Sequence, residues 1–500
     1  MLAEILNFQG AKPCLGVGSF SYLINLFLTS YITGTLGIEA YGFVTLSKTF
    51  VEYASVITIA LTSFIVRYVS VSYHHDDYTE ANSYYSSSIV ACLTLSAIVF
   101  ICACVLILKL ESIINIPSNI VDSVKILFLI SFLSFLITTI SSPFTSAAYI
   151  KNKLDVVGFI KILSYVVNAG IMVFLFRALS PELWFVGIGS LCAAITLFVG
   201  NYALTKAETP ELKFCKSLMS FSKIKNLLKN GIWNSLNQLG NELNSGLDLL
   251  ISNLMLSAVA MGQISVVKNI GIIFSTLNIT IFQPFNPALI EAYSKGNTDQ
   301  LKNELRKAMR ICGLFSAVVF SGFIALGQVY MKLWLPEQDF EFLYRLAIIN
   351  IGYNITAGVM QPVYYVSTLT LKNKLPCVIT ISGGILNIIL MYFLLKYTSL
   401  GAIAVVGTTT VIMLCINLFF NPVYSAKCIN ISPRFFYKII VKHILGNVVL
   451  ILIFRYIGGI LNPQSWMGII LTAFVMALVG APIYIFMTMD NIIGIQKKSI

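Results

Sequence analysis

The stretch that decides the fold reads AYGFVTLSK at residues 40–48, because a second copy, AMGQISVVK, occupies residues 260–268. Ala, Gly and Lys recur at the same offsets, and both copies lie in long apolar runs. A second pair, KNKL at 151–154 and KNKL at 372–375, has nearly the same separation. Two matches in one register indicate a duplicated unit of roughly 220 residues.

The composition is that of a polytopic membrane protein. Of the 500 residues, 57% are hydrophobic and 11% are charged, and the mean hydropathy is +0.85. A soluble surface requires far more charge than this. The net charge of +12 would suit a nucleic-acid partner. The cations lie mostly in alternate loops, however, so membrane topology explains them better.

Apolar runs of about 20 residues are long enough to cross the hydrocarbon core, and the sequence contains fourteen candidates. They lie at about 14–36, 42–66, 86–108, 123–148, 156–179, 183–204, 231–255, 262–289, 311–334, 342–366, 377–397, 402–424, 439–459 and 466–489. We therefore expect an all-α integral membrane protein with about fourteen transmembrane helices. Because six is even, two six-span repeats share one orientation and are related by a pseudo-two-fold axis along the membrane normal.

Four regions follow from this arrangement. We expect an N-lobe at 1–205, a cytoplasmic amphipathic linker at 206–230, a C-lobe at 231–425, and two further spans with a cytoplasmic tail at 426–500. Within the linker, 212–228 alternates Lys with Leu, Phe and Met, which favours an interfacial helix on an anionic leaflet. A solvated linker is the alternative.

Loop charges set the orientation. One set of loops carries most of the Lys and Arg residues, and the opposite set is short and holds few. The positive side is cytoplasmic, so both termini are predicted to lie in the cytoplasm. Trp184, Trp334 and Trp466 fall near the outer margin, where an aromatic belt belongs.

The lysines of the repeated stretch are the first candidates for a substrate site. Lys48 and Lys268 occupy equivalent places inside spans two and eight, where an ionisable side chain usually faces a cavity or a partner. Two such cations would attract an anionic substrate such as a phosphate. Alternatively, Lys48 pairs with Glu52 at i+4, and Lys268 snorkels to the outer headgroups.

Span seven is the most polar run. One helical face carries side chains at steps of three or four, namely Asn234, Asn237, Asn241, Asn244, Asp248 and Ser252. Such a stripe lines water or joins helices, and we favour a cavity wall. Asp248 would neutralise Lys268 or carry a coupling cation. Glu242 beside the stripe would titrate, and Glu52 is a third candidate for ion coupling.

Prolines interrupt several of the spans, at Pro143, Pro284, Pro287, Pro362 and Pro422. A Pro-broken helix suits a transporter that bends, and a static kink is the alternative. Arg345 begins span ten near the outer face. It is either a further substrate-binding cation or an interface anchor.

The sequence contains no pattern typical of catalysis. It has no Walker A sequence, no metal cluster and no nucleophile constellation. Its ten Cys residues show neither a disulfide framework nor a metal spacing, apart from a lone Cys102-x-Cys104. We expect no catalytic residue, no metal and no cofactor, and these absences fit a carrier rather than an enzyme.

The arrangement as a whole resembles the Wzx-type polysaccharide flippases of the MOP superfamily. The resemblance rests on two parallel six-span halves with an extra pair of spans, on the AxGxxxxxK stretches of spans two and eight, and on the KNKL loops after spans four and ten. It covers nearly the whole chain. It implies a bacterial inner-membrane protein that moves an undecaprenyl-diphosphate-linked oligosaccharide, an O-antigen or capsule repeat unit, to the periplasmic leaflet by alternating access coupled to an ion gradient.

The same resemblance implies roles for the candidate residues and partners. Lys48 and Lys268 would meet the pyrophosphate or acidic sugars, the Asn residues and Asp248 would line the lumen, and Glu242 or Asp248 would couple the ion. A polymerase or ligase of the O-antigen pathway is an expected partner beside membrane lipid. Nucleic acid is not.

Relatives within the superfamily give the competing interpretations. The lipid II flippase branch is richer in Arg, whereas span one here has no charge. The multidrug and toxin extrusion branch often has an acid in span one, which is missing here, although Glu242 is similar to a cation site of some extruders. A membrane-embedded glycosyltransferase or polymerase would need a large outside loop, and every outside loop here is short.

Overall fold

The computed structural model describes residues 11–488, which form helices joined by short connections and contain no strand. The chain divides into two compact units. The first comprises the described residues up to Ser265 together with Thr380–Ile388, and the second comprises Val266–Ile379 and the described residues from Ile389 onward. The predicted all-α class is confirmed. The lobe boundaries stay predictions, and the predicted cytoplasmic tail after Thr488 lies outside the described residues.

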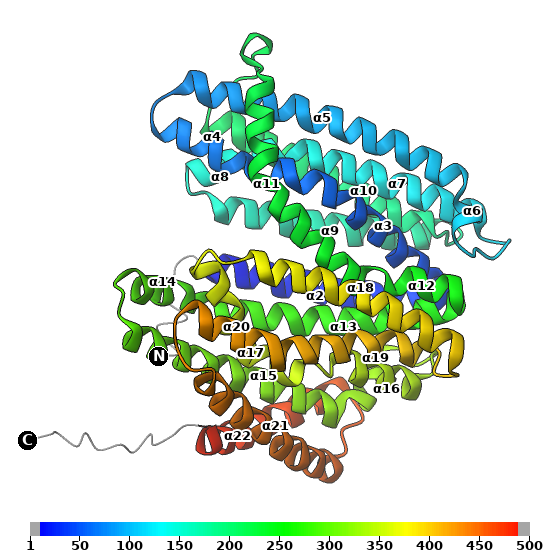
Figure 1. Cartoon of the computed structure of the whole chain (residues 1–500). Helices are drawn as coiled ribbons and strands as arrows, with labels where there is room; N and C mark the ends of the chain where they lie inside the picture. Colours follow the sequence, from blue (N-terminus) through cyan, green and yellow to red (C-terminus); the bar gives the residue numbers. More distant parts are fainter. Residues whose placement is uncertain (1–10, 489–500) are drawn as a thin grey trace, which may run out of the picture. The chain divides into compact units, whose positions relative to one another are not determined.

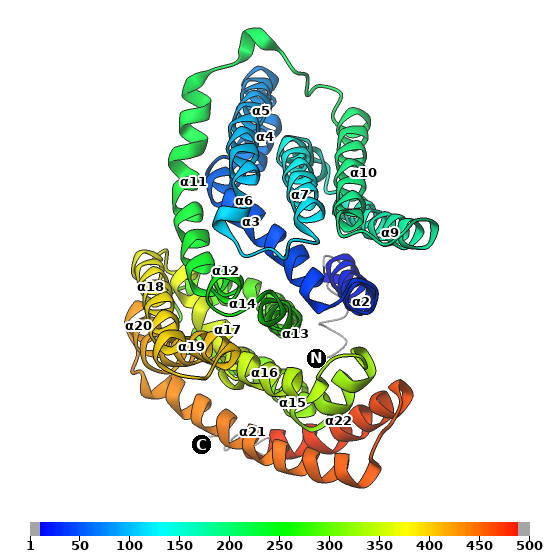
Figure 2. The same ribbon diagram turned by 90° about the vertical axis from the view of Figure 1, so that its right-hand side faces the viewer.

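The first unit is built from long apolar helices that pack side by side (Figure 1). Helix α10 packs against both α7 and α9, α5 packs against α7, and α11 runs along α3 and α5 (Figure 2). The helices are α2 (Ala11–Leu36), α3 (Ile38–Thr62), α4 (Ile65–His74), α5 (Tyr78–Leu108), α6 (Leu110–Ile113), α7 (Val121–Ser141), α8 (Ser146–Ile150), α9 (Leu154–Ala178), α10 (Trp184–Glu208), α11 (Phe221–Asn241) and α12 (Asp248–Met255).

The second unit is organised around α15, which packs against α17, α21 and α22. Helix α13 (Ala258–Phe282) begins in the first unit and continues into the second. The remaining helices are α14 (Asn286–Ser294), α15 (Thr298–Trp334), α16 (Phe340–Ile351), α17 (Asn354–Leu369), α18 (Lys374–Tyr397), α19 (Ala402–Cys415), α20 (Asn421–Cys428), α21 (Arg434–Leu461) and α22 (Trp466–Thr488).

Eleven helical segments of the described chain are long and apolar enough to cross a membrane. Three predicted runs, 14–36, 231–255 and 342–366, are helical but are not among these eleven. The run at 231–255 carries the polar stripe and is interrupted by a π-helix at Glu242–Gly246. The run at 342–366 is broken between α16 and α17. The count of fourteen spans therefore stays a prediction.

Four of the five prolines singled out in the sequence lie at a change of helix type. Pro143 and Pro284 lie in 3₁₀ turns, and Pro287 is at the start of α14. Pro422 opens α20, directly after a π-helix at Ile416–Phe420. Pro362, by contrast, lies inside the continuous helix α17. A proline removes one helical hydrogen bond and favours such local changes.

The predicted interfacial helix at 212–228 begins later than expected, because α11 starts only at Phe221. Residues 209–220, here called the linker strap, contain only one 3₁₀ turn at Lys216–Leu218. Leu212 and Leu227 are buried in an apolar cluster with residues of α4 and α5. These leucines therefore cover the first unit, and the prediction of a helix at 212–220 was wrong.

The linker strap is held by a row of polar side chains on α5. Asn82 binds the carbonyl of Glu211 and the N–H of Lys213 at 3.0 and 2.8 Å. Further along α5, Ser83 donates to the carbonyl of Leu218, and two more serine hydroxyls each accept a strap N–H. The strap satisfies its backbone groups on side chains instead of on a helix of its own.

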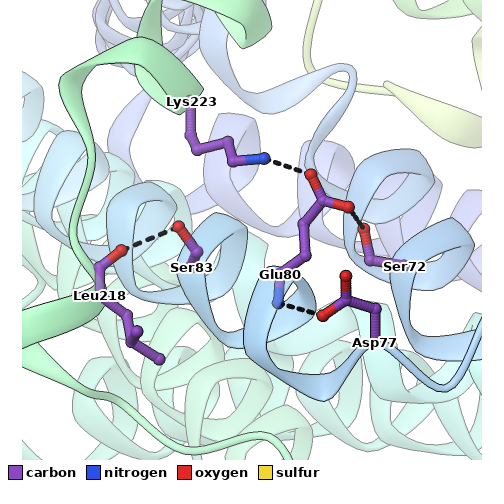
Figure 3. A network of polar contacts seen from close by, with 6 residues as sticks. All are labelled: Ser72, Asp77, Glu80, Ser83, Leu218 and Lys223. Carbon is purple, nitrogen blue, oxygen red and sulfur yellow. Dashed lines mark hydrogen bonds and ion pairs between the residues drawn. The ribbon is translucent and has the colours of Figure 1, made fainter.

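An ion pair follows the linker strap. Lys223, in the first turn of α11, pairs with Glu80 of α5, and the same carboxylate accepts a hydrogen bond from Ser72 of α4 (Figure 3). The backbone N–H of Glu80 is capped by the Asp77 side chain at 2.8 Å. One carboxylate therefore ties three helices together.

Candidate functional site

The glycines of the repeated stretch form a close helix crossing within the first unit. A Cβ atom on Gly42 of α3 would lie 2.9 Å from the backbone nitrogen of Gly262 and 2.8 Å from Cε of Met261. A Cβ atom on Gly262 would collide with the carbonyl oxygen of Ile38. Small residues let helix backbones approach in this way inside a membrane. The recurring Gly is therefore explained by packing.

Each repeated Lys follows its Gly by six residues. Lys48 of α3 belongs to the first unit and is exposed, whereas Lys268 of α13 belongs to the second unit and is half-buried. Arg345, in α16 of the second unit, is exposed.

The polar face of span seven divides into two parts. Asn234, Asn237 and Asn241 are exposed on α11. Asn244 and Asp248 are 1% and 3% exposed, in and just after the π-helix. A π-helix widens the turn and is frequent at functional sites. The first half of the predicted stripe is therefore exposed, and the second half is buried.

Asn244 joins helices within the first unit. Its side-chain amide donates to the backbone carbonyls of Gly240 and Thr380 at 2.9 and 2.6 Å, and the backbone carbonyl of Asn244 accepts from the Asn387 side chain at 2.8 Å. Thr380 and Asn387 belong to the part of α18 that packs in this unit. This is the helix-joining use of a polar residue that the sequence left open.

One of the acidic candidates lies beside Tyr53, a residue that the sequence did not single out. A Cβ atom on Gly246 would contact both the Glu242 carboxylate and the Tyr53 ring. The Tyr53 hydroxyl donates to the carbonyl of Gly246 in the π-helix at 2.7 Å.

The Glu242 carboxylate, 8% exposed, accepts from the Gln238 amide at 2.7 Å. The described residues hold no group of three side chains with metal-ligand geometry.

A second polar cluster lies in the second unit and was not predicted. The Asn417 amide donates to Thr356 at 3.3 Å, and its oxygen accepts from the Tyr364 hydroxyl at 2.7 Å. Asn354, at the break between α16 and α17, accepts from Asn278 of α13 at 3.2 Å. Asn417 lies in the second π-helix. The single Asn residues within the apolar runs at 342–366 and 402–424 could have indicated this cluster, because a polar side chain inside a span usually has a partner.

Comparisons with known proteins agree with this architecture. The structure resembles the lipid II flippase MurJ in an inward closed conformation, with a TM-score of 0.68, 16% identity, and coverage of 94% of this chain and 98% of that one. It also resembles an inward-facing multidrug resistance MATE family transporter of the MOP superfamily, with a TM-score of 0.66 at 12% identity, over 82% of this chain and 96% of that chain. The fold is therefore the one that these two solved proteins share, and the chain is a multi-pass membrane protein.

The family is defined by the sequence itself. Residues 35–340 match the model of the family described as polysaccharide biosynthesis protein. An uncharacterized membrane protein of Bacillus subtilis (strain 168), EpsK, is 27% identical over 452 residues, which cover 90% of this chain and 89% of EpsK. The chain belongs to this polysaccharide biosynthesis protein family. The predicted resemblance is confirmed by the family match, and the fold is the one of the solved lipid II flippase and MATE transporter.

Proposed function

We propose that the protein flips an undecaprenyl-diphosphate-linked oligosaccharide, an O-antigen or capsule repeat unit, from the cytoplasmic to the periplasmic leaflet by alternating access. The family match supports a role in polysaccharide export. The observation that carries the proposal is the polar, interrupted helix pair α11–α12 with its carboxylates, in a chain that is otherwise apolar. A sugar cargo requires such a hydrophilic lining in the membrane.

In this proposal the cations serve the diphosphate and the acids serve the driving ion. Lys48, Lys268 and Arg345 bind the phosphate groups. The exposed amides of α11, Asn234, Asn237 and Asn241, contact the sugars, while Asn244 supports the helix that carries them. Glu242, Asp248 and Glu52 couple transport to a proton or sodium gradient.

The proposal also specifies the location and partners. In this proposal the protein resides in the bacterial inner membrane. Both termini lie in the cytoplasm, because Lys and Arg are concentrated in one alternate set of loops along the sequence. It hands its cargo to an O-antigen polymerase or ligase. A lipid II-type flippase and a MATE-type antiporter are the alternatives, favoured by the likeness of fold.

Replacement of Lys268 tests the cationic site. In Lys268→Ala we expect lipid-linked oligosaccharide to accumulate and surface polysaccharide to fall, at a normal protein level in the membrane. Lys268→Arg retains a cation and should keep export, and Lys307→Ala, which removes an exposed charge from α15, should behave as the wild type. Normal export by Lys268→Ala would remove this residue from the site.

The acidic residues are tested by ion dependence. Glu242→Gln and Asp248→Asn should change how export responds to pH or to collapse of the sodium gradient. An unchanged response in both variants would contradict ion coupling at these positions. If deletion of the gene leaves the polymer intact with no second flippase present, the flippase proposal fails and small-cation extrusion becomes the function to test.

A further inference from the structure

The linker strap and the first turns of α11 leave large apolar side chains exposed. Leu212 and Leu227 are buried against the first unit. Phe214 and Phe221, by contrast, are 52% and 79% exposed, and Met219 at the end of the strap is 37% exposed. The leucines of the predicted interfacial helix are therefore covered by protein, while other apolar residues of the same segment are left without such cover.

On α11 the exposed side chains form a stripe that combines aromatic and basic residues. The stripe contains Phe221, Lys225, Lys229 and Trp233, which follow one another at steps of four and are all exposed. Residues four apart lie on one helical face. Lys225 and Lys229 each lie two positions from the buried Leu227, which is a rotation of about 200° around the helix. The stripe therefore faces away from the cluster on which Leu227 packs.

The lysines of this segment are not engaged by carboxylates. Lys216, Lys225 and Lys229 are exposed, and none of them forms an ion pair within the described part of the chain. Lys223, on the other side of α11, is the one that pairs with Glu80. A cluster of such lysines next to a spanning helix is attracted to an anionic leaflet.

The segment lies at the ends of two helices that are long and apolar enough to cross a membrane. The strap directly follows one of them, α10, and is bonded to Asn82 and Ser87 in the first turns of the other, α5. In the last turns of α10, the Lys206 ammonium lies 4.9 Å from the ring centroid of Tyr202. Such a pair of Lys and an aromatic ring is typical of the membrane–water interface. The strap is therefore at the depth of lipid headgroups.

We propose that the strap and the first turns of α11 are a membrane-anchoring surface, which docks on an anionic leaflet. Phe214, Met219 and Phe221 enter the boundary between headgroups and acyl chains, and Lys225 and Lys229 bind lipid phosphates. The positive charge of the segment and the negative charge of the leaflet are complementary. The strap then forms a layer whose main chain is held by α5 and whose aromatic side chains are held by lipid. The inference depends on neither the cargo nor the driving ion.

The test locates two side chains relative to lipid in the full-length protein, reconstituted in nanodiscs. An environment-sensitive fluorescent amino acid replaces Phe214 or Phe221. Its quenching by a spin label on the upper acyl chain is measured as phosphatidylglycerol replaces phosphatidylcholine. The reference position is Asp299, whose side chain is 89% exposed and which lies about 18 Å along α15 before the predicted span at 311–334.

The charge variant is Lys225→Gln/Lys229→Gln. The matched control, Lys307→Gln/Lys427→Gln, removes two exposed cations from the second unit. We expect the lipid label to quench both probes in the strap region and not the probe at 299. The ratio of docked to undocked protein should fall about 25-fold in the charge variant, from about fivefold for each membrane-proximal Lys, so that more phosphatidylglycerol is needed for the same quenching. The control should match the wild type.

Two further measurements make the result decisive. High salt should weaken docking of the wild type, because it screens exposed charges. Amide exchange at Cys215 and Ser220 reports whether the strap keeps its bonds to α5, which separates loss of docking from detachment of the strap. Probes at 214 and 221 that are quenched no more than the probe at 299 would overturn the anchoring surface in favour of a solvated face. Quenching that is independent of phosphatidylglycerol, salt and the two lysines would overturn recognition of an anionic leaflet.

Discussion

Replacement of Gly262 by Ala should destabilise the first unit because no space exists for a methyl group. The added Cβ would collide with the Ile38 backbone carbonyl oxygen, which cannot rotate away as a side chain does. At Gly42 the added atom would lie 2.8–3.0 Å from Met261 and Gly262 atoms. Normal carbon contacts are about 3.5–4.0 Å, so α3 and α13 would have to separate by about 0.5–1 Å there.

The magnitude follows from two opposing effects. Overpacking costs about 1–3 kcal/mol, and Ala in place of a helical Gly gains about 1 kcal/mol of helix propensity. For Gly42→Ala, where a flexible Met takes part of the strain, we expect a net loss of about 0–2 kcal/mol. For Gly262→Ala we expect a loss of about 2 kcal/mol or more.

The assay is reversible unfolding in detergent micelles by titration with sodium dodecyl sulfate, followed by circular dichroism. Gly170→Ala is the matched control, because this glycine of α9 lies in the same unit and a Cβ there meets nothing within 4 Å. The control should be as stable as the wild type or more stable by up to about 1 kcal/mol. If Gly262→Ala behaved like Gly170→Ala, the close crossing would be refuted, and the recurring glycines would need another explanation.

Three further predictions concern polar contacts away from the crossing. Ser87→Ala removes the acceptor of the Ser220 N–H and should speed amide exchange at Ser220 about fivefold, for a loss of about 1 kcal/mol; unchanged exchange would contradict the contact. The pKa of the Glu211 carboxyl is lowered by hydrogen bonds from its own backbone and from the Tyr73 hydroxyl, and by nearby lysines. Protection of the amides of residues 209–220 from hydrogen exchange should therefore be full at pH 7 and fall as pH drops below the usual glutamate range. Exchange protection that stays level down to pH 3 would argue against this. Asn417→Leu leaves the Tyr364 and Thr356 hydroxyls without this hydrogen-bond partner. It should lower the free energy of unfolding by about 1–3 kcal/mol in the same detergent titration, whereas unchanged stability would show that other contacts hold the π-helix.

The sequence predicted the features that depend on composition and spacing. Apolar runs fix helices in a membrane because every backbone group must be paired within the segment. The repeat at 40–48 and 260–268 drew attention to α3 and α13. The functional interpretation concerned the lysines of this repeat, whereas its glycines have the clearest structural role. Hydropathy could not predict that role, because it does not report how closely two helix backbones approach.

The contacts that were missed join residues far apart in the chain. Ser86 accepts from the N–H of Cys215, and Asn354 accepts from Asn278. Alternation of Lys with apolar residues at 212–228 favoured a helix on a lipid surface, because the pattern does not say which apolar surface covers the leucines. In the structure, Leu212 and Leu227 pack against residues of α4 and α5 instead of against lipid. The position of Glu242 beside Tyr53 likewise depends on how α3 meets the π-helix.

The mode of attachment of the linker strap has a consequence for how this segment evolves. Asn82, Ser83, Ser86 and Ser87 hold main-chain atoms of 211–220, and every amino acid other than proline presents the same main-chain atoms. Most strap positions should therefore tolerate substitution, apart from the buried Leu212 and from Glu211, whose side chain accepts from the Tyr73 hydroxyl. Proline is excluded at the bonded N–H groups, and the short polar residues of α5 stay constrained. A sequence alignment of relatives would then show variable residues at most strap positions and conserved small hydroxyl and amide residues at the positions of α5 that bind the strap.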